Sequence, residues 1–197
     1  MLRRLGTTLG ILVLVASAAM AQPVPASPGA YRMDRERTSV SWKVDQLGYS
    51  KFTGRFTRFD GTLNLDPDSL EDAKLVVIID PASIRTDFPF AEHFDKELSD
   101  DTEFLNSPRF PRITFASTKV ERTGRTMARV TGELTMLGIT RPLALDVALE
   151  SAGGQPAEAS LVFTATGKLR RSDFGIVTRT FIIDDVSLQI EAAFKKF

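Results

Sequence analysis

Few side chains in this sequence are of the types that perform catalysis or bind metals. The 197 residues include no cysteine and a single histidine, His93, which lies close to Glu92 and Asp95. Without cysteine, the chain has no disulfide, thiolate metal site, thiol nucleophile or lipid-modified cysteine. A lone histidine beside acidic residues is typical of a protein surface, because no second histidine or cysteine can complete a site. We therefore expect no catalytic residue, no metal and no cofactor.

Two charged clusters are weak candidates for a site. Asp100, Asp101 and Glu103 lack the ligand spacing of a calcium-binding loop, so a solvated helix start is the simpler interpretation. The run Arg171-Ser172-Asp173 could form a salt bridge near a barrel mouth or meet an anionic head group, and we favour the structural role. With 25 basic and 25 acidic residues, the chain lacks the charge excess expected of a nucleic-acid-binding protein.

The N-terminus has the three parts of an export signal. A basic start, Met1–Arg4, precedes an apolar run from Leu9 to Ala16, and Ala19-Met20-Ala21 supplies small residues for signal peptidase. An uncleaved membrane anchor is the alternative, but it needs roughly 20 apolar residues and this run is shorter. We therefore expect residues 1–21 to be a signal peptide cleaved between Ala21 and Gln22, and the mature protein to be exported.

The mature chain is predicted to be a short linker followed by one domain. Residues 22–30 contain three prolines and little to bury, which favours a flexible tether, and residues 31–197 form the domain. No later segment is long and apolar enough to span a bilayer.

Apolar and polar residues alternate with a period of two from Thr38 onward, which is typical of half-buried β-strands. No helix alternates with the strands, so the sheet is expected to be antiparallel. Closure into a barrel would remove the exposed edges, and we favour it over a two-sheet sandwich, the alternative. The pattern predicts eight strands, around Val40–Val44, Phe52–Leu65, Leu75–Ile79, Ile113–Phe115, Val130–Met136, Leu143–Leu149, Leu161–Leu169 and Val186–Ile190.

Two of these strands depart from simple alternation. In the second strand the apolar parity changes between Phe56 and Phe59, which predicts a bulge or bend near Thr57 and Arg58. The third strand, Leu75–Ile79, is apolar at every position, which predicts burial on both faces.

A helical insert interrupts the strands at about residues 87–106. Phe90, Phe94 and Leu98 repeat at a spacing of four, which predicts one or two short helices with an apolar face. This face is expected to cover an open end of the barrel, either as a plug that completes the core or as a lid over a cavity.

The barrel interior is predicted to be apolar. The chain has fourteen phenylalanines, one tryptophan and two tyrosines, so few of its aromatic rings carry a polar group. An eight-stranded barrel is either just filled by its side chains or holds one small ligand. Inward glycines at positions 54, 61, 132 and 167 favour an apolar tunnel because they leave space, but periodicity by itself leaves both alternatives open.

Several short motifs, in order along the chain, resemble the YceI-like family. They are Tyr31–Asp34, Leu47–Ser50, Gly54–Gly61, Phe104–Asn106, Phe110–Phe115, Gly132–Pro142 and Arg171–Ile176. The resemblance covers almost the whole mature chain. It implies a lipocalin-like, eight-stranded antiparallel barrel, usually periplasmic, with an elongated cavity that binds a polyisoprenoid or a similar long-chain amphiphile. A homodimer is suggested by this resemblance alone.

The resemblance makes the tunnel the favoured interpretation of the inward face. The side chains expected to line it are Trp42, Val44, Phe52, Phe56, Phe90, Phe94, Ile113, Phe115, Leu134, Met136, Leu145, Phe163 and Leu188. Many relatives carry histidine where this chain has Gln46 and Leu137, which implies a different contact with a ligand head group.

Three functions follow from these observations. The favoured one is a carrier or binding protein for an isoprenoid lipid or another long-chain amphiphile, such as a polyprenyl lipid, an isoprenoid quinone or a fatty amide. The alternative is a structural or stress-response barrel that binds no ligand and acts through its surface loops. A hydrolase or isomerase that uses His93 is the weakest of the three.

Overall fold

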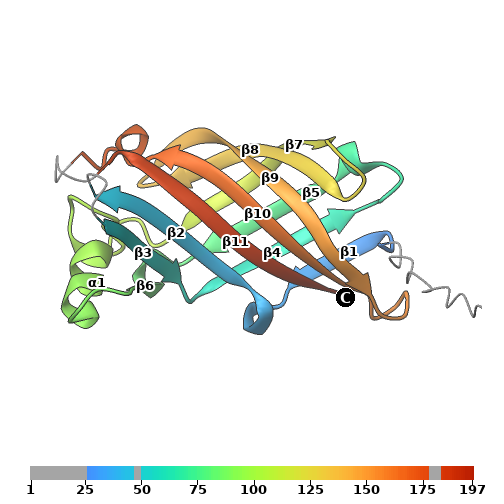
Figure 1. Ribbon diagram of the computed structural model, residues 1–197, viewed down its shortest axis with the longest axis horizontal. Helices are drawn as coiled ribbons and strands as arrows, with labels where there is room; N and C mark the ends of the chain where they lie inside the picture. Colours follow the sequence, from blue (N-terminus) through green and yellow to red (C-terminus); the bar gives the residue numbers. More distant parts are fainter. Residues whose placement is uncertain (1–25, 47–49, 178–182) are drawn as a thin grey trace, which may run out of the picture.

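The computed structural model describes residues 26–46, 50–177 and 183–197 (Figure 1). The predicted signal peptide, with its cleavage site between Ala21 and Gln22, lies outside these residues. The first strand begins at Gly29, so that the last two residues of the predicted linker belong to the barrel.

The described chain forms one antiparallel sheet with one α-helix, α1 (Ala91–Asp100). Short 3-10 turns occur at η1 (Arg35–Arg37), η2 (Leu70–Asp72), η3 (Pro81–Ser83) and η4 (Arg171–Phe174). The strand segments are β1 (Gly29–Met33), β2 (Ser39–Gln46), β3 (Ser50–Phe56), β4 (Phe59–Leu65), β5 (Lys74–Ile79), β6 (Ile84–Thr86), β7 (Ile113–Arg122), β8 (Met127–Met136), β9 (Ile139–Gly153), β10 (Ser160–Arg170) and β11 (Asp185–Lys196).

The sheet closes on itself as a barrel of eight long strands. Neighbours follow the order β1-β4-β5-β7-β8-β9-β10-β11, and β11 pairs with β1 to close the ring. Three of the eight strands are interrupted, so that β1 continues as β2, β3 as β4 and β5 as β6. The last strand, β11, shows this directly, because Val186–Glu191 pair with β2 and Phe194–Lys196 pair with β1. The predicted eight-stranded antiparallel barrel is confirmed, and the sandwich alternative is excluded.

The predicted bend near Thr57 and Arg58 is confirmed as the break between β3 and β4. Ser83, which is fully buried in η3, holds this break against the break between β5 and β6. Its hydroxyl accepts hydrogen bonds from the backbone N–H groups of Thr57 at 3.2 Å and Arg58 at 2.9 Å, and it donates to the carbonyl of Asp80 at 2.7 Å. The apolar parity changes at the break because the chain turns between two straight segments.

The prediction that Leu75–Ile79 is buried on both faces is wrong. Only alternate side chains of β5 face the interior, while Val76 and Ile78 lie on the outside with 43% and 40% of their surface exposed. The barrel wall is a single layer at β5, so one face of the strand meets solvent whatever residues it carries.

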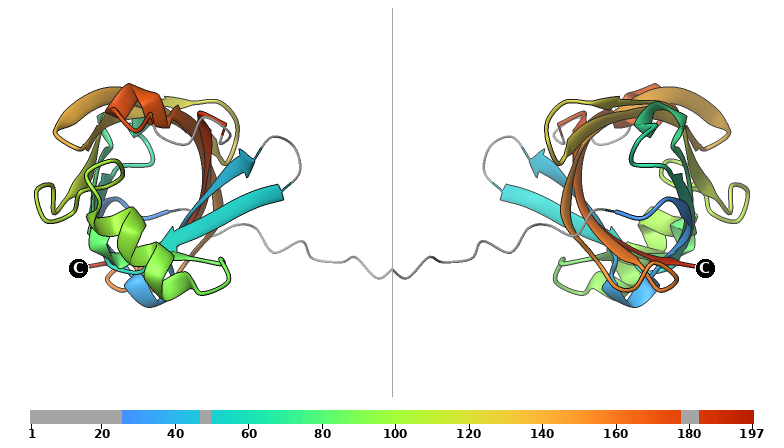
Figure 2. Two further views of the ribbon diagram at one scale, coloured as in Figure 1. Left: turned by 90° about the vertical axis from the view of Figure 1, so that its left-hand side faces the viewer. Right: turned by 90° about the vertical axis from the view of Figure 1, so that its right-hand side faces the viewer.

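The predicted helical insert is present as α1, followed by turns up to β7. In the left-hand view of Figure 2, α1 lies across part of one open end of the barrel. Hydrogen bonds as well as apolar contacts attach α1 to the barrel. The carboxylate of Asp95, only 5% exposed, accepts hydrogen bonds from the backbone N–H of Thr86 at 2.9 Å and its hydroxyl at 2.7 Å. In the described part of the chain, no helix is long and apolar enough to cross a bilayer.

Candidate ligand-binding cavity

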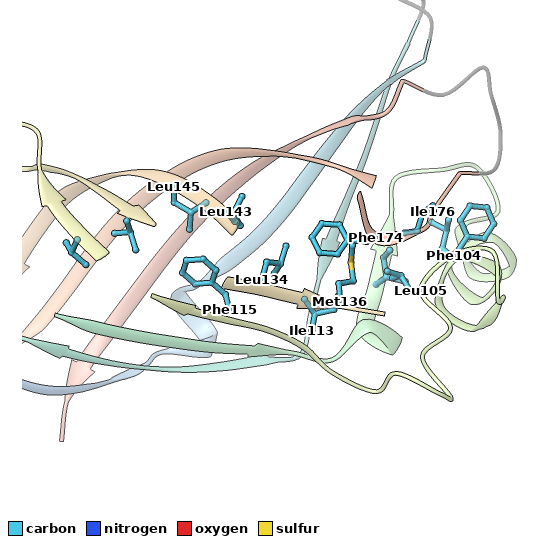
Figure 3. Packing of buried hydrophobic residues seen from close by; sticks show 14 of the residues in the cluster. Phe104, Leu105, Ile113, Phe115, Leu134, Met136, Leu143, Leu145, Phe174 and Ile176 are labelled. Atoms are coloured by element: carbon cyan, nitrogen blue, oxygen red, sulfur yellow. The ribbon is translucent and has the colours of Figure 1, made fainter. Parts of the chain in front are cut away.

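The inside of the barrel contains a cavity of about 610 Å³. Side chains from the strands, from α1 and from the turns after it line this cavity, and nearly all of them are apolar. Of the described lining residues, Ser41, Glu97 and Arg171 have a hydroxyl or a charge. Figure 3 shows part of the lining, with Phe115 and Leu134 along β7 and β8, and Phe104 and Leu105 near α1.

The structure places all the predicted cavity residues except Phe90 in this lining. They are Trp42, Val44, Phe52, Phe56, Phe94, Ile113, Phe115, Leu134, Met136, Leu145, Phe163 and Leu188. They face the interior because each lies on the inward parity of its strand or on the inward side of α1.

Phe90 differs from the prediction because it points outward. It is 93% exposed and precedes the first residue of α1 as its N-cap, with φ 64° and ψ 40° in the left-handed region. The spacing of four that linked Phe90 to Phe94 holds only inside a helix. Since the helix begins one residue later, Phe90 leaves the stripe that Phe94 and Leu98 continue.

The prediction that inward glycines leave open space is also wrong. Trp42 lies directly opposite Gly54, and a Cβ at Gly54 would be 2.6 Å from Trp42 Cε2. A Cβ at Gly132 would be 2.5 Å from Phe115 Cζ. The same holds at position 167, where a Cβ would meet Leu145 at 2.7 Å, and at position 61, where it would meet Met33 at 3.0 Å. These glycines make room for large neighbouring side chains and add no volume to the cavity.

Several lining residues were missed because they lie in irregular segments. Phe88 precedes α1, Phe104 and Leu105 follow it, and Ile176 follows η4. No period of two or 3.6 runs through such segments, so their inward direction has no signal in the residue pattern. The family motif Phe104–Asn106 was the only hint that this turn contributes to the interior.

The insert is both an end wall and part of the lining. Phe94 and Leu98 of α1 line the cavity without filling it, so the segment is not a plug that completes a solid core. Behind α1, the backbone N–H of Ser107 donates to the carbonyl of Ser99 at 2.8 Å, and the two hydroxyls lie 3.2 Å apart. These bonds, with those of Asp95, fix the helix at the barrel end.

The charged groups near the rim are held in structural contacts. Asp173 pairs with Arg170 at 2.9 Å, and the side chain of Asp184 accepts from the N–H and hydroxyl of Ser172 at 2.9 and 2.6 Å. Burial raises the pKa of Asp184, but these hydrogen bonds outweigh burial and the net pKa is lowered. Arg171 lines the cavity and also donates from Nη1 to the carbonyl of Ile176 at 3.2 Å.

The remaining polar candidates do not converge on a site. His93 is exposed on α1. The expected helix start at Asp100 is wrong, because Asp100 is the last residue of α1, and Asp101 accepts from the backbone N–H of Glu103 at 2.8 Å in the turn after the helix. The described residues contain no group of three or more histidine, aspartate or glutamate side chains placed to hold a metal ion.

The two departures from the family histidines fall in different places. Gln46 is the last residue of β2. Leu137 and Gly138 form the two-residue turn between β8 and β9, with φ 54° and 74°, as a type I′ turn requires. Leu137 packs on the core cluster but is not among the cavity-lining residues.

Comparison with known proteins identifies the family. The family model of the YceI-like domain matches residues 31–194. A UPF0312 protein of an Enterobacter species is 36% identical over 179 residues, which cover 89% of this chain and 87% of the relative.

Two solved structures share the fold. BcnA of Burkholderia cenocepacia superposes with a TM-score of 0.71 at 20% identity, over 82% of this chain and 98% of BcnA. A polyisoprenoid binding domain from Saccharophagus degradans, implicated in plant cell wall breakdown, has a TM-score of 0.66 at 10% identity, over 85% of this chain and 98% of that domain. From the match of the family model along the barrel and the identity with the relative, the chain belongs to the YceI-like family.

Proposed function

We propose that this protein is a periplasmic binding or carrier protein that holds a long-chain isoprenoid lipid, or a similar amphiphile, inside its barrel. The observation that carries the proposal is the cavity of about 610 Å³ with an almost wholly apolar lining. Polyprenyl lipids, isoprenoid quinones and fatty amides share the long apolar chain that such walls favour. The role is binding, and no catalytic step is assigned.

The size of the cavity argues for an occupant. Side chains that face an apolar volume of this size lack packing partners on one side and so lose dispersion contacts. An apolar chain inside the barrel restores the missing contacts, whereas water finds few polar partners there.

The lining also favours an amphiphile over a pure hydrocarbon. Glu97 on α1 and Arg171 on η4 line the cavity, and both elements lie at the same barrel end. Met33 on β1 and Phe194 on β11 line the part of the cavity toward the other end. A ligand in this cavity would place a polar head near α1 and its tail toward β1.

Two further observations support the proposal. The Saccharophagus domain that shares the fold is described as binding a polyisoprenoid. The N-terminal pattern of a basic start, an apolar run and Ala19-Met20-Ala21 supports export to the periplasm.

Native mass spectrometry of the mature protein, before and after extraction with organic solvent, tests the proposal. We expect a bound species that extraction removes, and rebinding when the extracted protein is mixed with a long-tailed ubiquinone. Trp42 is the only tryptophan of the sequence and lines the cavity, with its ring centroid 5.5 Å from that of Phe52. The fluorescence emission of Trp42 should therefore change on rebinding. A protein without a bound species that also fails to bind any isoprenoid, quinone or fatty chain would contradict the proposal.

A further inference from the structure

The cavity reaches the protein surface beside Phe88. Of the described lining residues, Phe88 is the one whose side chain is largely exposed, at 48%. Its ring centroid lies 4.9 Å from that of Phe94 and 6.1 Å from that of Phe52. Phe52 in turn lies 5.5 Å from Trp42, so a row of aromatic rings leads from the interior to solvent. The opening therefore lies between β3 and the start of α1.

Phe90 displays a second ring next to this opening. It is 93% exposed, so its ring contributes almost nothing to the folded core. Its backbone adopts φ 64° and ψ 40°, a conformation that costs a non-glycine residue about 1 kcal/mol or more. A strained backbone that presents a large apolar side chain to water works against stability, which points to a role outside the fold.

Two more exposed apolar side chains lie on the rim of the same end. Ile183 is 39% exposed, and its N–H donates to the carbonyl of Asp45 near the end of β2 at 3.0 Å. Val177 is 68% exposed and directly follows Ile176, which lies beside Phe104 in Figure 3. With Phe88 and Phe90 they form what we call the apolar rim. Phe88 and Phe90 precede α1 and Val177 follows η4, and both elements lie at the barrel end that faces the viewer in the left-hand view of Figure 2.

We propose that the apolar rim docks on the surface of a lipid bilayer, so that the opening beside Phe88 faces the membrane. The four side chains come from three separate segments of the chain, whereas a stable protein interface buries about 800 Å² of closely fitted surface on each partner. A bilayer accepts isolated rings without such a fit, and aromatic side chains suit its interfacial region. Continuity between the rim and an apolar cavity also favours lipid as the partner.

The charged side chain next to Phe88 is paired with an opposite charge. Asp87, next to Phe88, pairs with Arg55 at 3.4 Å and accepts from the hydroxyl of Thr53 at 2.6 Å. Opposite charges held this close present little net field to a membrane. Binding is therefore expected to come from insertion of the apolar side chains and to depend weakly on salt.

Flotation with vesicles of phosphatidylcholine tests the docking with the full mature chain. We expect the wild-type protein to float with the vesicles at low and high salt. Phe90→Asn removes the ring, keeps a residue type that tolerates the left-handed conformation, and should weaken the partition to vesicles by about tenfold. Phe197, 69% exposed at the opposite barrel end, provides the matched control, and Phe197→Asn should float like the wild type.

The outcomes separate this inference from the proposed function. Wild-type protein that stays away from the vesicles, or an equal loss in Phe90→Asn and Phe197→Asn, overturns the docking. A protein that floats with lipid-only vesicles but binds no long-tailed ubiquinone contradicts only the proposed function. If both hold, Phe90→Asn should slow ubiquinone transfer from vesicles, followed by Trp42 emission, and leave the equilibrium quenching of Trp42 unchanged.

Discussion

The indole ring of Trp42 packs against the backbone of Gly54, its directly opposite partner on β3. Gly132 of β8 is covered in the same way by the ring of Phe115, which lies two residues before the direct partner of Gly132 on β7, Ser117. In both cases the glycine accommodates a ring that lines the cavity. The cavity walls are therefore closely packed, and the free volume lies along the axis of the barrel.

We expect Gly132→Ala to destabilise the protein by about 1–3 kcal/mol, because the new Cβ would be 2.5 Å from the Phe115 ring and would also meet the carbonyl oxygen of Ala116. A backbone carbonyl in a strand ladder cannot move aside easily. Urea unfolding measures the loss. Gly153→Ala is the matched control, since a Cβ there meets nothing within 4 Å. Equal stability of the two variants would contradict the packing described for Gly132.

Filling the cavity should block the ligand without harming the fold. Ala165 of β10 is buried and lines the cavity, so Ala165→Phe should place its ring in the free volume. We expect affinity for a long-tailed ubiquinone to fall by about tenfold or more, with an equal or higher melting temperature because a cavity is filled. Thr166→Phe, on the exposed face of the same strand, should bind normally. Undiminished binding by a folded Ala165→Phe would place the ligand elsewhere.

Asp95 is expected to hold α1 on the barrel end. Asp95→Ala removes the acceptor for the backbone N–H and hydroxyl of Thr86, which is itself buried. Leaving such groups without a partner should lower the free energy of unfolding by about 1–3 kcal/mol. Lys96→Ala breaks only the exposed pair with Asp100 and should cost less than about 1 kcal/mol. Chemical denaturation of both variants measures the difference, and equal losses would contradict the anchoring role.

Asp34 should make stability depend on pH. Its pKa is lowered, chiefly by the side-chain hydrogen bond from Lys195, whose Nζ lies 2.8 Å from Asp34 Oδ2. A lowered folded-state pKa stabilises the protein fully above the unfolded value of about 3.9, and this contribution is lost as the pH falls through the folded value. Asp34→Asn should therefore be less stable than wild type at neutral pH, and the gap should close in strong acid.

Urea titrations at several pH values test the role of Asp34. The exposed Asp68 in the turn before η2 serves as the control, and Asp68→Asn should show no such change in the gap. A gap between wild type and Asp34→Asn that stays constant with pH would mean that the carboxylate charge is not the cause.

Export should leave a defined N-terminus. Mass spectrometry of the protein recovered from the producing cell is expected to show a chain that begins at Gln22, because Ala19 and Ala21 would occupy the −3 and −1 positions of the predicted signal-peptidase site. A membrane-bound species that retains Arg3 and Arg4 would contradict the signal peptide.

The residue pattern by itself determined the eight strands, their antiparallel arrangement and the bend at Thr57 and Arg58. The strands and the bend follow from local alternation, because a strand with one buried face must place apolar residues at every second position. The antiparallel arrangement follows from the lack of helices between the strands. Alternation also placed Leu134, Met136 and most of the other predicted lining residues on the inward face. The short motifs, in their order along the chain, indicated the YceI-like family, and each motif is also a local feature of the sequence.

The tertiary structure alone decided which positions are open and which are filled. A glycine leaves space only if no ring from the neighbouring strand covers it, and Trp42 covers Gly54. The exposure of Val76 and Ile78 depends on what lies outside the barrel, and the direction of Phe90 depends on where α1 begins. These are contacts between segments distant in sequence or boundaries between elements. Periodicity within one segment carries no information about either, so the cavity and its opening appear only when the barrel is closed.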